Sequence, residues 1–425
     1  MVDMNQTDVK AMQTLIRLAS AGARKEDISG LSVDWSTVLP LAAEQQVIPL
    51  VACALLHSPG LVCPDQLHEY LLNVMRAESS ANMIRRQRIM YLLQEMKAAG
   101  IDAKLLKGYA VSGCYAHPEC RGSVDTDILI DIRQEKQTVK FMEQHDFRVD
   151  PRAATSQHAV CQHKKYGMVE LHVALYADLV QDNWFRNVNE TDLVQEPAIM
   201  VEGVCTLGHT DQLLFLTLHM VKHFILEGLT LRMMLDIALY FERHKQEIDV
   251  GRYWSILEKL HYDGLVNGIL WNMIRLGGFH VEDFPGLPEE QPEQMTLILH
   301  DLQLGGYMGV RQKNERLESG MEYNRQLLRK QQSVWQYRLH MLGWKIKSGA
   351  KYMFPSIKML QNLYPVTKKT PVLLPFFWFW QFVSFPIKKV RSGALQRDVR
   401  SENSAMTKVT EERIAMFSEL GMLDE

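Results

Sequence analysis

Hydrophobic and polar residues follow two different periods along the chain. In the first hundred residues the apolar positions recur every three to four residues, which predicts amphipathic helices. The longest such stretch covers 65–99. Near the N-terminus, Thr7 or Asp8 can cap a helix that is expected to stop at Gly22. The pattern therefore predicts an N-terminal helical region over 1–100.

The period changes after residue 100. Short runs of β character alternate there with helical stretches, and within 124–131 the side chains of Asp125 and Asp127 fall on one face. The predicted strands cover 101–106, 124–131, 157–164 and 168–173, and the predicted helices cover 109–115 and 134–145. The order β-α-β-α-β-β predicts an α+β fold with a small mixed-sheet core over 101–205. Helical periodicity returns over 206–330, most strongly at 213–225 and 231–244.

Composition is that of an ordinary globular protein. The chain has 425 residues, of which 47% are hydrophobic and 23% are charged, so a mainly disordered or fibrous protein is excluded. This length suggests two or three domains, and a hydrophobic core large enough to be stable without disulfides or structural metals. Its six cysteines form no Cys-x-x-Cys motif, and the first residues carry no signal-peptide pattern. We therefore expect free thiols and a cytoplasmic location.

The last part of the chain, 331–425, is basic. Residues 338–400 contain twelve Lys or Arg and one acid, a net +11, which leaves −14 for the rest of a chain whose total is −3. This surface could meet phosphates, nucleic acid or a membrane, or it could pack on the acidic remainder of the same chain. An apolar run at 372–387 is 16 residues long, shorter than the ~20 residues of a spanning helix. Burial against the helical domain is the favoured interpretation, and a peripheral membrane contact by 372–391 is the alternative.

Acidic residues on neighbouring strands point to a metal site. Asp125 and Asp127 lie at i and i+2, so their carboxylates project from one face and repel unless a cation lies between them. Oxygen ligands of this kind suit Mg²⁺, with Mn²⁺ as an alternative. Glu170 can add a third carboxylate from another strand, with His172 on the same face. A lone Asp-x-Asp is more often a solvated strand end, so the downstream Glu-x-His matters to this prediction.

Basic residues beside this motif suit phosphate. Gly108 lets the backbone approach a phosphate at the start of a helix, where free N–H groups are available. Lys107 would supply a cation there, or it would pair with a local carboxylate. Arg121 has the same two interpretations, phosphate contact or structural salt bridge.

A histidine pair lies further along the chain. His219 and His223 have the i, i+4 spacing of a transition-metal pair, although packing near the cleft is favoured in so apolar a helix. Lys222 and Arg232 are further candidates for phosphate contact.

These motifs together resemble a known group of enzymes. The chain resembles the DNA polymerase β-like nucleotidyltransferase superfamily and, more closely, a family of uncharacterised bacterial nucleotidyltransferases. The resemblance covers most of the chain. It is carried by Lys107-Gly108, Arg121-x-x-x-Asp125-x-Asp127, Glu170-Leu171-His172, His219, His223 and Asp236.

The resemblance implies a reaction and a set of site residues. The reaction would be Mg²⁺-dependent transfer of a nucleoside monophosphate from a nucleoside triphosphate (NTP) to an acceptor hydroxyl, with release of pyrophosphate. Asp125, Asp127 and Glu170 would be the catalytic and metal-binding residues. The NTP would be contacted by Lys107, Gly108, Arg121 and His172.

Two departures from the superfamily pattern leave other functions open. Tyr109 stands where the superfamily usually has Ser, with Ser112 one helical turn later, and residues 117–122 lengthen the connection from Gly108 to Asp125. One alternative is a non-catalytic nucleotide- or partner-binding module on the same fold. Another is a toxin-like transferase that acts on RNA or protein. The acceptor, whether small molecule, saccharide, peptide or RNA, stays open.

Overall fold

The computed structural model describes residues 6–123, 125–150, 158–175, 190–226, 228–305 and 415–422. The predictions for the basic segment 338–400 and the apolar run 372–391 lie outside these residues. Among the helices that are described, none is long and apolar enough to cross a membrane.

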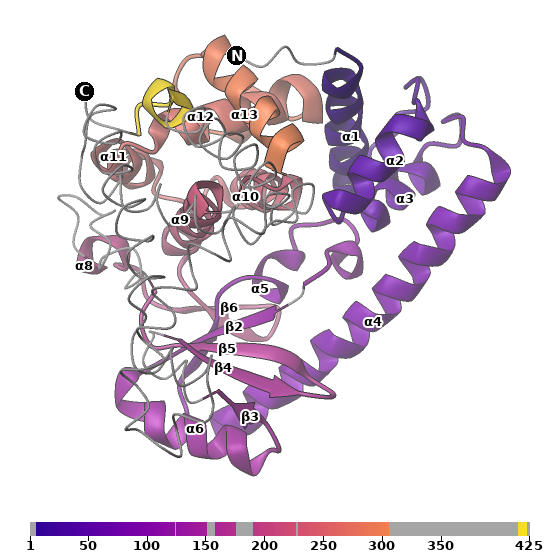
Figure 1. Cartoon of the computed structure of the whole chain (residues 1–425). Coiled ribbons are helices and arrows are strands. Elements are labelled where there is room, and N and C mark those ends of the chain that lie inside the picture. Colours follow the sequence, from indigo (N-terminus) through magenta and orange to yellow (C-terminus); the bar gives the residue numbers. More distant parts are fainter. Residues whose placement is uncertain are drawn as a thin grey trace, which may run out of the picture.

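Four helices form the N-terminal part, as the periodicity predicts: α1 (Gln6–Arg24), α2 (Trp35–Glu44), α3 (Ile48–His57) and α4 (Asp65–Ala98). In Figure 1, α4 runs diagonally from the other helices to the sheet. The expected stop of the first helix at Gly22 is wrong, because α1 continues to Arg24. A Cβ at Gly22 would lie 1.8 Å from the carbonyl oxygen of Leu50. This glycine therefore allows α1 and α3 to approach backbone to backbone.

The chain forms a mixed five-stranded sheet, which confirms the α+β class. Its strands are β1 (Ala103–Leu105), β2 (Asp125–Ile130), β3 (Arg148–Val149), β4 (His158–His163) and β5 (Gly167–His172), in the order β1-β2-β5-β4-β3. Only the β2–β5 pair is parallel. Helices α5 (Tyr109–Ser112) and α6 (Glu135–Gln144) lie where helices were predicted, whereas the short β3 was not predicted.

The chain beyond the sheet is mainly helical. It contains α8 (Glu190–Leu193), the unpredicted hairpin β6 (Ile199–Val201) and β7 (Val204–Thr206), then α9 (His209–Leu226), α10 (Leu231–His244), α11 (Val250–Leu260), α12 (Asp263–Asn272) and α13 (Pro292–Gly305). In Figure 1, α9 and α10 lie between the sheet and the outer helices. Residues of α9 and α10 line the candidate site together with Asp125 at the start of β2.

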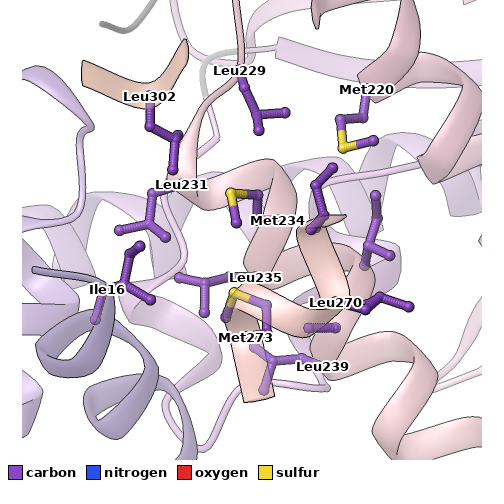
Figure 2. Packing of buried hydrophobic residues seen from close by; sticks show 14 of the residues in the cluster. Ile16, Met220, Leu229, Leu231, Met234, Leu235, Leu239, Leu270, Met273 and Leu302 are labelled. Atoms are coloured by element: carbon purple, nitrogen blue, oxygen red, sulfur yellow. The ribbon is translucent and has the colours of Figure 1, made fainter. Parts of the chain in front are cut away.

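One hydrophobic core joins helices from both ends of the described chain. Figure 2 shows Ile16 of α1 close to Leu235 of α10 and Met273 after α12, and all three are fully buried. Each such side chain contributes roughly 1.5–3 kcal/mol by leaving water. The division of the chain into four parts stays a prediction, but this core holds α10 and the elements beside it in place. The site residues on α9 and α10 thus rest on a rigid support.

Candidate active site

The parallel pairing of β2 and β5 builds the centre of the site. Asp127 lies directly opposite Glu170, and Leu129 lies opposite His172. Paired residues of adjacent strands share a face, and residues two apart on one strand share it too. Accordingly, Nε2 of His172 lies 3.0 Å from Oδ1 of Asp127 and 3.7 Å from Oε2 of Glu170. The opposite face of β2 carries Ile128, which is buried in the core of the sheet.

These three side chains fit a divalent cation. Ligand atoms of Asp127, Glu170 and His172 all lie within 4.8 Å of one another, and within the described ranges no other group of three or more possible ligands comes so close. Oδ2 of Asp127 is buried and accepts no hydrogen bond, so it keeps a lone pair for a cation. Two carboxylates and an imidazole suit Mg²⁺ or Mn²⁺ better than a thiolate-preferring metal. His219 and His223, the other metal candidates, belong to no such group among the residues that the structure describes.

Lys107 lies on the other side of Asp127. Its Nζ donates a hydrogen bond to Oδ2 of Asp125 at 3.1 Å and lies 3.2 Å from Oδ2 of Asp127. The second contact lacks hydrogen-bond geometry and is therefore electrostatic. A third neighbour is Nε2 of His219 on α9, at 3.2 Å. Lys107 thus pairs with local carboxylates, and its contact with a phosphate stays a prediction.

Lys107 and the acids beside it stabilise one another's charged forms. Burial alone would lower the pKa of Lys107, but the charges of Asp127 and Asp125 raise it above its usual value. Burial would raise the pKa of Asp127, yet Lys107 and His172 hold it below its usual value. Burial, followed by the charge of Lys107, places the pKa of His219 well below its usual value. At neutral pH we therefore expect a charged Lys107, an ionised Asp127 and a neutral His219.

His172 is shifted in the opposite direction from His219. Burial alone would lower the pKa of His172, but its hydrogen bonds to Asp127 and Glu170 raise it to about 8. The imidazolium, held by these two acids, is therefore the favoured form at neutral pH.

Arg121 forms a buried ion pair with Asp236 of α10. Its Nε donates to Oδ1 at 3.0 Å and its Nη2 donates to Oδ2 at 2.5 Å, in a two-pronged arrangement. The hydroxyl of Tyr115 donates to the same Oδ1 at 2.7 Å. Both charged side chains are less than a tenth exposed. Arg121 thus forms a structural salt bridge, and its contact with a phosphate stays a prediction.

A small pocket opens beside this ion pair. Its lining combines cations, acids and apolar side chains from the connections between β1 and β2, from the start of β2, and from α9 and α10: Lys107, Arg121, Ser123, Asp125, Leu216, His219, Arg232, Met233 and Asp236. Arg232 also donates to the carbonyl oxygen of Gly122 at 3.2 Å. Lys222, the other predicted phosphate contact, is not part of this lining.

Ser123 lies beside Gly108 in space, although the two are fifteen positions apart in sequence. A Cβ at Gly108 would be 3.0 Å from Oγ of Ser123, which donates to the carbonyl oxygen of Asp125 at 2.7 Å. Ser112, which the sequence suggested instead, donates to the carbonyl oxygen of Tyr109 and is fully buried. The sequence analysis missed Ser123, although its position two residues before Asp125 was the available signal.

Gly108 adopts a backbone conformation with φ +64° and ψ −107°, which only glycine adopts readily. We expect Gly108→Ala to lower the free energy of unfolding by about 1–3 kcal/mol and to weaken triphosphate binding, since the added Cβ would press on Ser123. Chemical denaturation and calorimetry would measure the two effects. Gly100→Ala is the control, because Gly100 also has positive φ but no atom near its missing Cβ. Equal losses of triphosphate affinity in both variants would contradict a special role for Gly108.

Comparison with known proteins agrees with this geometry. Residues 32–276 match the sequence profile of a family described as "Uncharacterised nucleotidyltransferase". The chain belongs to this nucleotidyltransferase family. The match includes the N-terminal helices from just before α2, the whole sheet and α9 to α12, so it covers every residue of the site. No curated protein and no solved structure matches the chain.

Membership of this nucleotidyltransferase family indicates nucleotidyl transfer and an NTP as substrate. The structure brings six of the predicted site residues into one region: Lys107, Gly108, Arg121, Asp125, Asp127 and Glu170, with His172 beside the last two. It does not put Asp125 in the group of three possible metal ligands, which contains His172 instead.

Proposed function

We propose that this chain transfers a nucleoside monophosphate from an NTP to an acceptor hydroxyl and releases pyrophosphate. The observation that carries the proposal is the parallel register that sets Asp127 opposite Glu170, beside a pocket with three cationic side chains, in a chain of this family. A binding module has no need for two acids paired across neighbouring strands, whereas metal-dependent transfer from a triphosphate does.

The residues that would hold a divalent cation are Asp127 and Glu170, with His172 beside them. When bound, a Mg²⁺ or Mn²⁺ ion supplies charge stabilisation for the phosphoryl oxygens during in-line displacement. The Asp127 carboxylate is pre-oriented for this task because His172 donates to its other oxygen.

The pocket beside the Arg121–Asp236 ion pair would position the triphosphate. Arg232 and Ser123 both line it, and Gly108 lies against Ser123. The acceptor oxygen would attack the α-phosphorus, and the bond to the bridging oxygen would break as pyrophosphate leaves. Glu170, about a fifth exposed, is placed to take the proton of the acceptor hydroxyl.

A direct test is to incubate the purified chain with each common NTP and Mg²⁺ or Mn²⁺. We expect slow, metal-dependent conversion of one triphosphate to monophosphate and pyrophosphate, with water as a poor acceptor. Mass spectrometry of host extract treated with the same NTP should show one nucleotidylated product. If no triphosphate is bound or cleaved under any condition, the proposal fails and a partner-binding module becomes the better account.

Glu170→Gln separates catalysis from binding. The change keeps the volume and removes the charge, so we expect triphosphate affinity within a few-fold of wild type and a turnover loss of roughly 10²-fold or more. His172→Ala should cost less, because its role would be to orient a carboxylate. Glu143→Gln is the control, an exposed acid on α6 outside the site. Full turnover in Glu170→Gln alongside an inactive Asp127→Asn would show that Glu170 is not the base.

A further inference from the structure

The ammonium group of Lys107 occupies a defined position between two acids. It lies 3.1 Å from Oδ2 of Asp125 and 3.2 Å from Oδ2 of Asp127. An ammonium carries three protons and no acceptor, and its third close neighbour is Nε2 of His219 at 3.2 Å. The ammonium therefore has hydrogen-bond geometry with Asp125 and His219 and meets Asp127 through charge alone. The side chain of Lys107 is only 15% exposed, so little water competes for the group.

This position is where repulsion between Asp125 and Asp127 calls for a positive charge. Two carboxylates on one strand face need a cation between them, and the chain itself supplies one. Asp125 has no acid across the sheet from it, because its partner in β5 is Met168. Asp127 differs, since Glu170 and His172 lie beside it.

We infer that Lys107 is the built-in cation of the Asp125–Asp127 pair, so that the chain holds a single divalent cation, at Asp127 and Glu170 beside His172, instead of two. The presence of the single divalent cation rests on the proposed function. Asp125 is then a positioning residue that holds Lys107. His219 is a second one, which approaches the ammonium from α9.

The same arrangement sets the charge of the pocket. Its lining contains three cations, Lys107, Arg121 and Arg232, against two acids, Asp125 and Asp236. The excess of one positive charge favours a polyanion such as a triphosphate. Loss of Lys107 would remove this excess and leave Asp125 without its counter-charge.

The inference is tested by counting bound Mn²⁺ on the full chain by electron paramagnetic resonance, without nucleotide. We expect one ion per chain in wild type and two in Lys107→Met, because Asp125 and Asp127 are then open to a second ion. The double variant Lys107→Met/Asp125→Asn should return to one. Lys104→Met is the matched control on β1: it removes the same charge from a lysine that pairs with Asp102, and it should keep one ion.

Each count has a definite meaning. Two ions in wild type, or one ion still in Lys107→Met, would overturn the inference. One ion in both, with metal-dependent NTP cleavage, would leave the proposed function standing while the inference fails. No ion in wild type but one in Lys107→Met would support the built-in cation and contradict the divalent site of the proposed function.

A second variant covers the case in which Lys107→Met does not fold. Asp125→Asn removes the acid and leaves Lys107 paired with Asp127. We expect it to keep the one Mn²⁺ of wild type with affinity within about threefold, because Asp125 is not a ligand. Loss of that ion in Asp125→Asn would show that Asp125 binds the metal, as the sequence alone suggested, and would overturn the inference.

Discussion

Asp127→Asn is expected to abolish divalent-cation binding and to lower nucleotidyl transfer by at least about 10²–10³-fold, the range for loss of one preorganised electrostatic group. The side chain of Asp127 is 1% exposed and lies between His172 on one oxygen and Lys107 on the other. Asparagine keeps the shape but removes the charge that both the cation and Lys107 require. Mn²⁺ titration and the NTP cleavage assay would measure the two losses.

The sequence and the structure predict opposite effects of Asp127→Asn on the stability of the fold. On the sequence alone, removing one of two crowded acids relieves repulsion and should leave the fold intact or more stable. In the structure Lys107 already neutralises that repulsion, so Asp127→Asn leaves buried Lys107 and His172 with fewer counter-charges. We therefore expect a loss of about 1–3 kcal/mol in the free energy of unfolding.

Asp131→Asn is the matched control for this experiment. Asp131 follows the same strand but caps the next turn and pairs with Arg133, outside the site. It should keep both Mn²⁺ binding and NTP cleavage. If Asp127→Asn still binds Mn²⁺ as wild type does, the metal site lies elsewhere.

Arg121→Met is expected to lower the free energy of unfolding by about 3–5 kcal/mol, the largest stability effect we anticipate. The methionine would leave the carboxylate of Asp236 buried with only the hydroxyl of Tyr115 as a polar partner. Burial would lower the pKa of Arg121, but Asp236 raises it above its usual value, so the guanidinium stays charged. Urea denaturation would measure the loss.

The double variant Arg121→Met/Asp236→Leu identifies the cause. Replacing both members of a buried pair by apolar residues is often neutral, so most of the lost stability should return. Arg275→Met is the control, since Arg275 and Glu290 form a pair in which the arginine is 56% exposed, and its loss should cost less than about 1 kcal/mol. An equally unstable double variant would mean that the packing of Arg121, rather than its charge, holds α10 in place.

The same double variant informs on function. Because both residues line the pocket, it should fold yet bind triphosphate more weakly than wild type. Wild-type affinity in the stable double variant would confine Arg121 to a structural role and remove it from the predicted NTP contacts.

Local patterns were sufficient for most elements of the fold. The predicted helix at 231–244 is α10 (Leu231–His244), whose residues 234–241 are all buried and, apart from Asp236, hydrophobic, so its sequence records that burial. The strand that carries Asp125 and Asp127 was found for the same reason, with a period of two. The prediction failed at Gly22, where a glycine that normally ends a helix serves instead for close contact with α3.

Long-range pairing was not readable from the chain. The sequence left Arg121 between phosphate contact and salt bridge, since its partner Asp236 lies 115 residues further on. Ser123 was overlooked because its closeness to Gly108 depends on how the turn after β1 folds over the start of β2. In each case the missing information was a distance in space.

By itself the sequence determined the residue types of the site and the strands that carry them: the Asp-x-Asp of β2, the Glu-x-His of β5, and the Lys-Gly turn before α5. These follow from side-chain periodicity, which is a local property of the backbone. Only the tertiary structure decided which acid each cation meets. The β2–β5 register places Asp127 with Glu170 and His172, while α9 and the turn after β1 bring Lys107 to Asp125. Electrostatic partners depend on separations of a few ångströms, and those separations are set by packing between elements far apart in the chain.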